Sequence, residues 1–305
     1  MKYTYLLLLS LFSIPFLAQE NDNLLRDMKF RNVGPAGMSG RITSIDVNLK
    51  NDQEIYAGTA SGGLWRSRSG GQKWECIFNN EATLSIGAVK LSQKNTDVIW
   101  VGTGEGNPRN SHNSGKGIYK SIDGGVTWKL MGLENTRNIH KVLIHPDNEN
   151  IVYAAAIGVA WGESEERGVY KTIDGGLTWN KILYANETTG AADLVMDPEN
   201  PNKLIVAMWE HRRWPWFFQS GGEGSGIHVT HDGGLTWEKR TDKNGLPKGQ
   251  LGRVGLAISK SNTKVIYALV ENEKKNALYR SNDGGLNFTK VSENENIGNR
   301  PFYYS

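Results

Sequence analysis

The chain has 305 residues, of which 38% are hydrophobic and 22% charged, with a formal net charge of +3. So small a charge gives no electrostatic case for a nucleic-acid partner. The single cysteine, Cys76, excludes an internal disulfide, and the 36 glycines predict many tight turns between short strands.

The N-terminal residues have the features of a secretory signal peptide. Lys2 supplies a positive charge, an apolar run extends from Tyr5 to Phe12, and small Ala18 offers a cleavage point. The apolar run is shorter than the roughly 20 residues needed to span a bilayer. We therefore predict a signal peptide over 1–18, a lead-in segment over 19–40, and an exported protein in the periplasm, at the cell surface or secreted. No later segment is apolar enough to cross a membrane, so no integral membrane segment is expected.

A short motif recurs five times along the rest of the chain. The copies are LWRSRSGGQKW (64–74), IYKSIDGGVTW (118–128), VYKTIDGGLTW (169–179), IHVTHDGGLTW (227–237) and LYRSNDGGLNF (278–288). Their spacing is nearly constant at about 50 residues, which indicates a repeat architecture. We expect five units within 41–300, at about 41–80, 84–133, 138–185, 190–241 and 251–292.

Each unit has the pattern of four short strands. An alternating apolar run comes first, then a polar turn and a second β-rich run; a third strand enters the Gly-Gly turn and a fourth leaves it. This order is typical of one blade of a β-propeller. The fold class predicted is therefore all-β, a β-propeller of four-stranded blades. Residues 301–305 resemble the start of a sixth blade, which favours an incomplete, larger propeller over the alternative of a complete five-blade ring.

The repeated motif resembles the Asp-box, or bacterial neuraminidase repeat, Ser/Thr-x-Asp-x-Gly-x-Thr-Trp. Copies two to four match it fully, whereas Ser69 replaces the Asp in copy one and Phe288 replaces the Trp in copy five. A turn Asp satisfies its own backbone N–H groups, and the paired glycines supply positive φ. We therefore interpret these residues as structural, with each Trp packed between sheets: Asp123, Asp174, Asp232, Asp283, Trp74, Trp128, Trp179 and Trp237.

The loops between the second and third strands of the blades are the candidate binding surface. They lie on the face opposite the Asp-box turns, and they are long in blades two, three and four. In blade four, Met208 and Trp209 are expected to end the second strand, and the rest of WEHRRWPWFF to overhang that face. Aromatic planes beside Arg suit sugar rings or peptides; the alternative is that the aromatics only pack the loop. The candidate ligand-binding residues are Arg41, Arg109, His140, Trp161, His211, Arg212, Arg213, Trp214, Trp216 and Arg253.

Three families of known propellers bear on function. Sialidases use a Phe/Tyr-Arg-Ile-Pro segment, which Phe30-Arg31-Asn32-Val33 does not reproduce. The two-propeller xyloglucan-degrading glycosidases carry a catalytic Asp in Thr-Asp-x-Gly-Gly-Ala-Tyr-Arg, and the similar segment here has Ala60 at the acid position. Glycoside hydrolysis normally needs two carboxyl groups; Glu105 and Glu163 are the weak candidates for a relocated pair.

The third resemblance is to the sortilin-type propeller and its exported bacterial relatives. It rests on the opening NVGPAGMSGRITSIDV and on Arg213-Trp214-Pro215-Trp216 followed by Ser220 to Ile227. This resemblance implies a large propeller that binds peptide or protein segments. We therefore expect a recognition module for peptide, protein or glycan ligands, without cofactor or metal and of unassigned oligomeric state. The alternatives are a glycosyl hydrolase-like enzyme acting on polysaccharide and, more weakly, an assembly or stability factor for an envelope complex.

Overall fold

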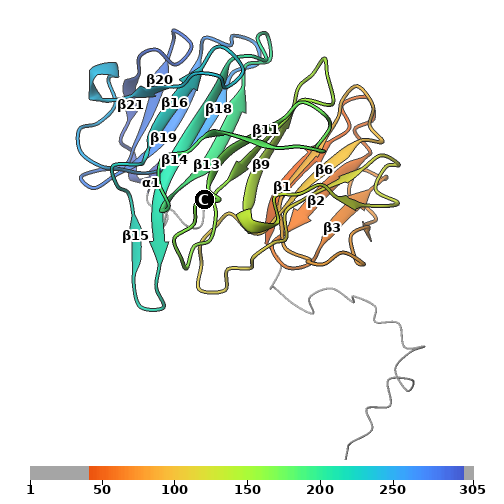
Figure 1. Ribbon diagram of the computed structural model, residues 1–305. Coiled ribbons are helices and arrows are strands. Elements are labelled where there is room, and N and C mark those ends of the chain that lie inside the picture. The colour runs from red at the N-terminus through yellow and green to blue at the C-terminus, as the bar shows by residue number, and fades with distance from the viewer. Residues whose placement is uncertain (1–40, 299–305) are drawn as a thin grey trace, which may run out of the picture. The chain divides into compact units, whose positions relative to one another are not determined.

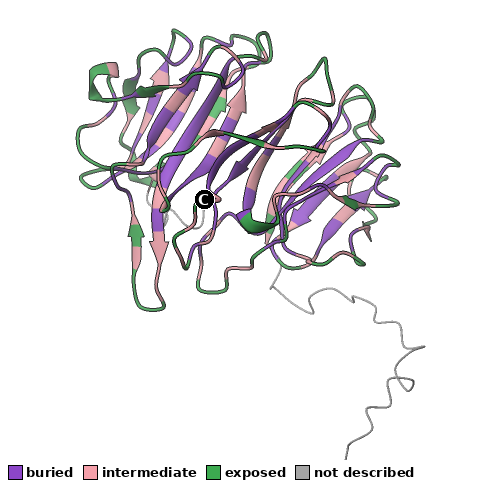
Figure 2. Ribbon diagram, viewed as in Figure 1, coloured by how far each residue is buried: buried purple, intermediate pink, exposed green. Residues whose placement is uncertain are grey.

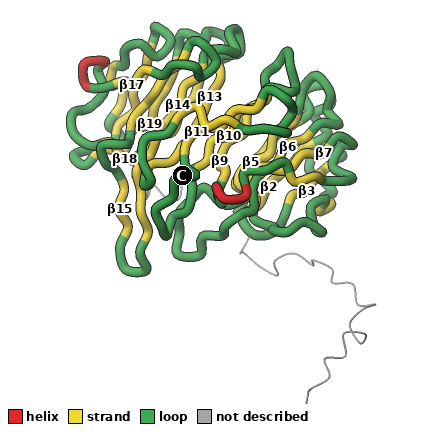
Figure 3. Tube along the Cα trace, viewed as in Figure 1, coloured by secondary structure: helices red, strands yellow, loops and turns green. Residues whose placement is uncertain are grey.

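Residues 41–298 of the chain are described by the structure, a computed structural model. They all lie within one of two units, Gly34–Ser305, the other being Met1–Val33. The predicted signal peptide, the lead-in segment 19–40 and the start of a sixth blade at 301–305 fall outside the described residues. Within them, strands make up nearly all of the regular structure (Figure 3).

The strands form five antiparallel sheets in chain order, which we call blades one to five. Blade one contains β1 (Ile42–Val47), β2 (Ile55–Thr59), β3 (Leu64–Ser67) and β4 (Glu75–Cys76). Blade two contains β5 (Ile86–Leu91), β6 (Ile99–Thr103), β7 (Ile118–Ser121) and β8 (Lys129–Leu130). Blade three contains β9 (Ile139–Ile144), β10 (Val152–Ala156), β11 (Gly168–Thr172) and β12 (Asn180–Leu183).

Blade four has a fifth strand. It contains β13 (Thr189–Met196), β14 (Leu204–Arg213), β16 (Gly226–Thr230) and β17 (Glu238–Arg240), with β15 (Phe218–Ser220) paired only to β14. Blade five contains β18 (Leu251–Ile258), β19 (Ile266–Asn272), β20 (Ala277–Ser281) and β21 (Thr289–Ser292). The helical pieces are η1 (Glu134–Thr136), η2 (Asp242–Asn244) and α1 (Glu295–Gly298).

Consecutive blades pack through their first strands. β1 contacts β5, β5 contacts β9, β9 contacts β13 and β13 contacts β18 (Figure 1). Blades one and five do not meet in this way, so the five blades do not close a ring among the described residues. The arrangement confirms the prediction of an all-β propeller with four-stranded blades and a ring left incomplete.

The core lies between neighbouring sheets, because each sheet is too thin to bury side chains within itself. Between blades one and two, for example, Tyr56 and Leu64 pack against Ile86 and Val101, and all four side chains are buried. Burial of each large apolar side chain contributes about 1.5–3 kcal/mol. The middle strands of each blade are accordingly the most buried part of the chain (Figure 2).

The Asp-box turns have the hydrogen bonds that their sequence predicts. Asp123 Oδ1 accepts from the backbone N–H groups of Val126 and Thr127 at 3.1 and 2.9 Å, while Asp123 Oδ2 accepts from the Thr127 hydroxyl. Hydrogen bonds from Thr127, then from Ser121, lower the pKa of Asp123 to about 2. Gly124 and Gly125 adopt φ of 69° and 85°, a region that disfavours residues with a Cβ. Asp174, Asp232 and Asp283 form equivalent turns.

The box tryptophans do not all pack between sheets. Trp128 and Trp179 donate from Nε1 to the carbonyls of Ile77 and Met131 in the preceding blade, each at 2.8 Å. Trp237 packs against the core shared by blades three and four. Trp74 differs from the expectation, since its side chain is 41% exposed. The physical reason is that blade one has no preceding blade among the described residues to receive it.

The WEHRRWPWFF segment also departs from its prediction. The second strand of blade four does not end at Trp209 but continues to Arg213, where it pairs with β15 in a hairpin. Residues 214–217 close that hairpin, with the Trp214 N–H donating to the Phe217 carbonyl at 2.8 Å. Pro215 occupies the second position of the turn, where its fixed φ is favoured. Figure 1 shows the β14–β15 hairpin projecting beyond the neighbouring strands.

Candidate functional site

The loops between the second and third strands of the blades share one face, which we call the mouth. It comprises residues 60–63, 104–117, 157–167, 214–225 and 273–276. These loops lie together because the strands of each blade alternate in direction. The first strands of the blades begin at the same face, so the mouth gathers residues from all five repeats.

Glu105 is held at the mouth by Arg41. Arg41 Nη2 and Nε donate to the two carboxylate oxygens at 2.7 and 3.0 Å. The Glu105 side chain is completely buried, and that of Arg41 is 29% exposed. Such a bidentate pair is a strong charge-assisted interaction. Because both oxygens are engaged, Glu105 is positioned as the anchor of Arg41 and not as a free proton donor.

The main chain of Glu105 is fixed as well. Its carbonyl accepts a hydrogen bond from Asn138 Nδ2 at 2.8 Å and lies 2.6 Å from His112 Nε2, while its N–H donates to the Asn113 carbonyl at 3.1 Å. Burial, more than any charge, lowers the pKa of His112. These contacts join the long loop of blade two to the start of blade three, and they make this part of the mouth a fixed structure.

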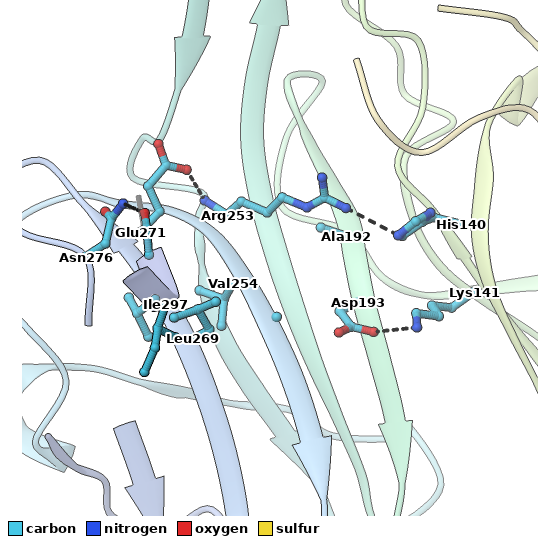
Figure 4. A pocket seen from close by; sticks show the side chains of 13 residues that line it. His140, Lys141, Ala192, Asp193, Arg253, Val254, Leu269, Glu271, Asn276 and Ile297 are labelled. Carbon is cyan, nitrogen blue, oxygen red and sulfur yellow. Dashed lines mark hydrogen bonds and ion pairs between the residues drawn. The ribbon is translucent and has the colours of Figure 1, made fainter. Parts of the chain in front are cut away.

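A second cluster surrounds Arg253 at the start of blade five. Its Nη1 donates to Asn107 Oδ1 at 2.7 Å, and its Nη2 lies 3.3 Å from His140 Nε2. Its backbone N–H donates to Glu271 Oε2 at 2.8 Å. The structure thus brings together two residues predicted as ligand-binding, His140 and Arg253, from blades three and five (Figure 4).

These side chains border a cavity of about 250 Å³. Strands β9, β13, β18 and β19 line it, so it opens among the first strands of blades three, four and five. Figure 4 shows the ion pair between Lys141 and Asp193, 3.4 Å apart, across the cavity from Glu271. Apolar contact comes from Val254 and Leu269. A cavity with both charged and apolar lining suits a small polar ligand.

Burial shifts the pKa values of the groups in this cavity. It lowers the pKa of His140 well below its usual value, with the Arg253 charge adding to the effect, so His140 is neutral near pH 7. It lowers the pKa of Arg253 to about 10, which leaves Arg253 charged. It also raises the pKa of Glu271, against the hydrogen bonds from Arg253 and Ser220. Burial and these hydrogen bonds therefore act in opposite directions on the Glu271 carboxyl group, and burial has the larger effect.

His211 and Arg167 form buried support behind this cluster. His211 is 1% exposed and stacks on Trp209, with ring centroids 4.4 Å apart. The Arg253 guanidinium lies over the Trp209 ring, 5.3 Å from its centroid. His211, predicted to contact ligand, is therefore placed in the interior. Its position follows from the unexpected length of β14, which carries it into the hairpin.

Arg167 is fully buried and donates to four backbone carbonyls. Its Nη1 bonds the carbonyls of Ile157 and Thr188 at 3.1 and 3.0 Å. Its Nη2 bonds those of Val159 and Gly162, the latter at 3.0 Å. Burial lowers its pKa to about 10. Arg167 therefore fixes the loop of blade three that carries Trp161.

The β14–β15 hairpin presents the remaining predicted residues. Arg213 donates from Nε and Nη2 to Asn110 Oδ1 at 2.9 and 2.6 Å, which joins the hairpin to the loop of blade two. The Arg212 guanidinium lies 5.3 Å from the Trp214 ring centroid. Trp216 is 83% exposed at the turn. The hairpin is therefore anchored next to its turn by Arg213 and displays an aromatic ring in the turn itself.

The other predicted residues occupy separate surroundings. Trp161 and Glu163 are exposed on the loop of blade three, and Arg109 is partly buried in the loop of blade two. Ala60 is completely buried in the loop of blade one. Glu105 and Glu163 thus differ in environment, one buried and ion-paired, the other solvated. That difference does not favour them as a matched acid and base.

Several residues of the site were not predicted from the sequence: Asn107, Asn110, Arg167, Asp193 and Glu271. Glu271 lies near the end of β19, at the start of a run of ordinary polar residues, so nothing distinguishes it in the sequence. Arg167 offers one signal, an Arg directly before a glycine that opens a strand. Within residues 41–298, no group of three or more His, Cys, Asp or Glu side chains is placed to hold a metal ion. No helix in that range is long and apolar enough to cross a membrane.

Known proteins similar to this chain include a receptor family and polysaccharide-degrading enzymes. Residues 116–243 match the family described as Sortilin-Vps10, "Sortilin, neurotensin receptor 3". A xyloglucanase of Paenibacillus sp. is 23% identical over 269 residues, covering 78% of this chain and 24% of that protein. Xyloglucanase Xgh74A of Acetivibrio thermocellus is 28% identical over 225 residues, covering 67% of this chain and 25% of that protein. The chain therefore spans about a quarter of the length of these relatives.

A solved structure agrees on the fold. The crystal structure of an ancestral GH74 enzyme superposes with a TM-score of 0.63 at 20% identity, covering 86% of this chain and 33% of that one. At this identity the likeness concerns the fold alone. Together with the repeat motif and the five antiparallel sheets, these findings show an Asp-box β-propeller that is similar in part to the Sortilin-Vps10 family and to xyloglucanases.

Proposed function

We propose that the protein is a glycosyl hydrolase-like propeller whose mouth binds a xyloglucan-like polysaccharide. The observation that carries the proposal is the likeness to xyloglucanases, which extends over 78% and 67% of this chain in the two relatives described. Glycan binding therefore replaces peptide recognition as the main functional hypothesis.

The chemistry of the mouth supports a glycan ligand. Exposed Trp216 and Trp161 offer flat apolar surfaces of the kind on which the apolar faces of sugar rings pack. Asn110 and Arg213 beside them supply a fixed amide and guanidinium for hydroxyl groups. The cavity of about 250 Å³ next to Arg253 is large enough for a single sugar ring or side branch.

For hydrolysis, Glu271 is the best placed carboxyl group among the described residues. It lines the cavity, and burial raises its pKa, as the proton donor of a glycosidase requires. Glu105 is occupied by Arg41 and Glu163 is solvated. We therefore propose that Glu271, and not the Glu105 and Glu163 pair, carries any proton transfer made by this part of the chain.

Affinity electrophoresis and reducing-sugar release with xyloglucan test the proposal. We expect xyloglucan to retard the protein, with less effect from an unbranched β-glucan, and Glu271→Gln to abolish release while leaving retardation intact. Glu163→Gln is the matched control and should retain release. Retardation by no polysaccharide at all would overturn the glycan assignment. Release that survives Glu271→Gln but disappears in Glu105→Gln would overturn the role of Glu271.

Peptide recognition is the second candidate, favoured by the match of residues 116–243 to the Sortilin-Vps10 family. The matched range contains the loops of blades three and four and the β14–β15 hairpin. A peptide library panned on the immobilised protein separates the two readings. Enrichment of peptides that xyloglucan does not displace would support recognition of peptides, whereas displacement by xyloglucan would support the glycan.

We also propose that the protein is exported, on the basis of the pattern in residues 1–18. N-terminal sequencing of the protein expressed in a Gram-negative host tests this proposal. We expect the mature chain to begin at Gln19. An intact N-terminus on a cytoplasmic product would contradict it.

A further inference from the structure

Arg212 and Arg213, adjacent on β14, differ in their hydrogen bonds. Arg213 donates twice to Asn110 Oδ1, at 2.9 and 2.6 Å. The side chain of Arg212 makes no hydrogen bond or ion pair with any of residues 41–298, and its Nε is buried there without an acceptor. A guanidinium carries five N–H donors, and burying one of them without an acceptor is unfavourable. Arg212 therefore has donors available that the fold itself does not use.

Arg212 lies where the β14–β15 hairpin meets the loop of blade three. The Arg213 N–H donates to the Ala160 carbonyl at 2.7 Å, which joins the two segments. The Arg212 guanidinium lies over the Trp214 ring, and a Cβ built on Gly162 would lie 3.9 Å from its Nη1. Because residue 162 is a glycine, it extends no side chain over this guanidinium. Arg212 is partly exposed, and only its Nε is fully buried, so a ligand in the mouth can reach the two Nη groups.

A second guanidinium, that of Arg167, lies close to Arg212. Arg167 is fully buried and donates to backbone carbonyls, that of Gly162 among them. Burial, and next the charge of Arg212, lower the pKa of Arg167 to about 10, which leaves it charged near pH 7. Glu163 and Glu210 attract Arg167, each with a smaller effect than the repulsion by Arg212. An anion bound to Arg212 would reduce the repulsion between the two guanidinium groups.

From these contacts and charges we infer that Arg212 binds a carboxylate of the ligand, carried by a uronic acid residue of a polysaccharide. The planar guanidinium can donate two parallel hydrogen bonds to the two oxygens of a carboxylate. Trp214 and the exposed Trp216 supply aromatic faces for the sugar ring that carries it. The inference rests on the proposed function, because it takes the ligand to be a polysaccharide. It adds that the preferred polysaccharide is acidic.

Isothermal titration calorimetry with two forms of one polymer tests the inference. The first is xyloglucan, and the second is xyloglucan in which primary hydroxyl groups have been oxidised to carboxylates. We expect the Kd of the oxidised polymer to be about tenfold lower or more, because it gains a charge-assisted pair with Arg212. In Arg212→Gln the two polymers should bind with equal Kd.

Arg68→Gln is the matched control for the loss of one positive charge. The side chain of Arg68 is 62% exposed in the Asp-box turn of blade one, on the face opposite the mouth. This variant should keep the full preference for the oxidised polymer. Arg212→Lys separates charge from geometry: it keeps the charge but loses the planar set of donors, so it should keep only part of the preference.

Urea denaturation checks that each variant is folded, and Arg212→Gln should unfold at the same urea concentration as the unchanged protein. Equal affinity of the unchanged protein for the two polymers would overturn the inference and leave the proposed function intact. So would a preference for the oxidised polymer that persists in Arg212→Gln. Binding of neither polymer would overturn the inference together with the proposed function.

Discussion

Arg41 and Glu105 form a two-point ion pair in which the carboxylate is completely buried and the guanidinium is 29% exposed. Arg41 precedes the first strand of blade one, whereas Glu105 belongs to the long loop of blade two. The pair therefore fixes the mouth where the first two blades meet. Removing a carboxylate from water costs free energy, and only the interaction with a charged partner offsets that cost.

Replacing Arg41 with Ala should destabilise the fold. The substitution leaves Glu105 buried without a counter-charge, and we expect a loss of about 2–4 kcal/mol, less than for a fully buried pair because Arg41 keeps contact with water. Urea denaturation gives the free energy of unfolding. Lys90→Ala is the control, since the Lys90–Asp46 pair is more exposed and should contribute about 1 kcal/mol at most. Equal losses in the two variants would contradict the argument.

The fold was predictable because its information is local. An Asp-box turn such as that of Asp123 satisfies its own backbone within a few residues, so the motif specifies the turn wherever it occurs. Five copies then predict five blades. Trp74 shows the limit of this reasoning: the motif predicts a buried Trp, but its burial depends on a neighbouring sheet that the motif does not contain.

The site was predictable only in part, because its contacts join distant segments. Arg253 and Asn107 are 146 positions apart, and Arg213 and Asn110 are 103 apart. Sequence reasoning assigned the arginines to the right face from loop position and residue type. It did not identify their partners, and it misplaced His211, because the extension of β14 beyond Trp209 depends on pairing with β15.

The Asp-box turns should make stability depend on pH in the acidic range. Hydrogen bonds from Thr127, then Ser121, lower the pKa of Asp123 from 3.8 to about 2. A folded-state pKa below the unfolded value stabilises the fold above about pH 4, and the contribution is lost as the pH falls through about 2. Chemical denaturation from pH 5 to about pH 2 should show a smaller acid-induced loss in Asp123→Asn than in the unchanged protein.

The control for this prediction is Asp52→Asn, in an exposed turn of blade one. The free energy of unfolding of Asp52→Asn should change with pH as that of the unchanged protein does through the acidic range. If Asp123→Asn and the unchanged protein lost the same stability between pH 5 and about pH 2, the carboxylate of Asp123 would not support the turn in the way described.

The exposed tip of the hairpin should affect binding more than folding. Trp216 is 83% exposed, so Trp216→Ala should leave the free energy of unfolding within about 0.5 kcal/mol. If the ring stacks on a sugar with an energy of about 0.5–1.5 kcal/mol, its loss raises the Kd for xyloglucan about two- to tenfold. Isothermal titration calorimetry measures the change. Leu235→Ala, an equally exposed apolar residue at an Asp-box turn, should bind normally.

Arg167 offers the strongest test of how the mouth is supported. Its guanidinium donates to the carbonyls of Ile157, Thr188, Val159 and Gly162, so Arg167→Met removes four hydrogen bonds at once. We expect a loss of about 3 kcal/mol or more in urea denaturation, together with faster proteolysis within 157–167. Arg167→Lys should restore only a small part of the lost free energy of unfolding, because an ammonium group cannot reproduce the planar arrangement of guanidinium N–H donors. The free energy of unfolding of Arg167→Met could instead lie within about 0.5 kcal/mol of that of the unchanged protein. In that case water would replace Arg167 as the hydrogen-bond donor to these carbonyls, and the loop that carries Trp161 would not depend on Arg167 for its position.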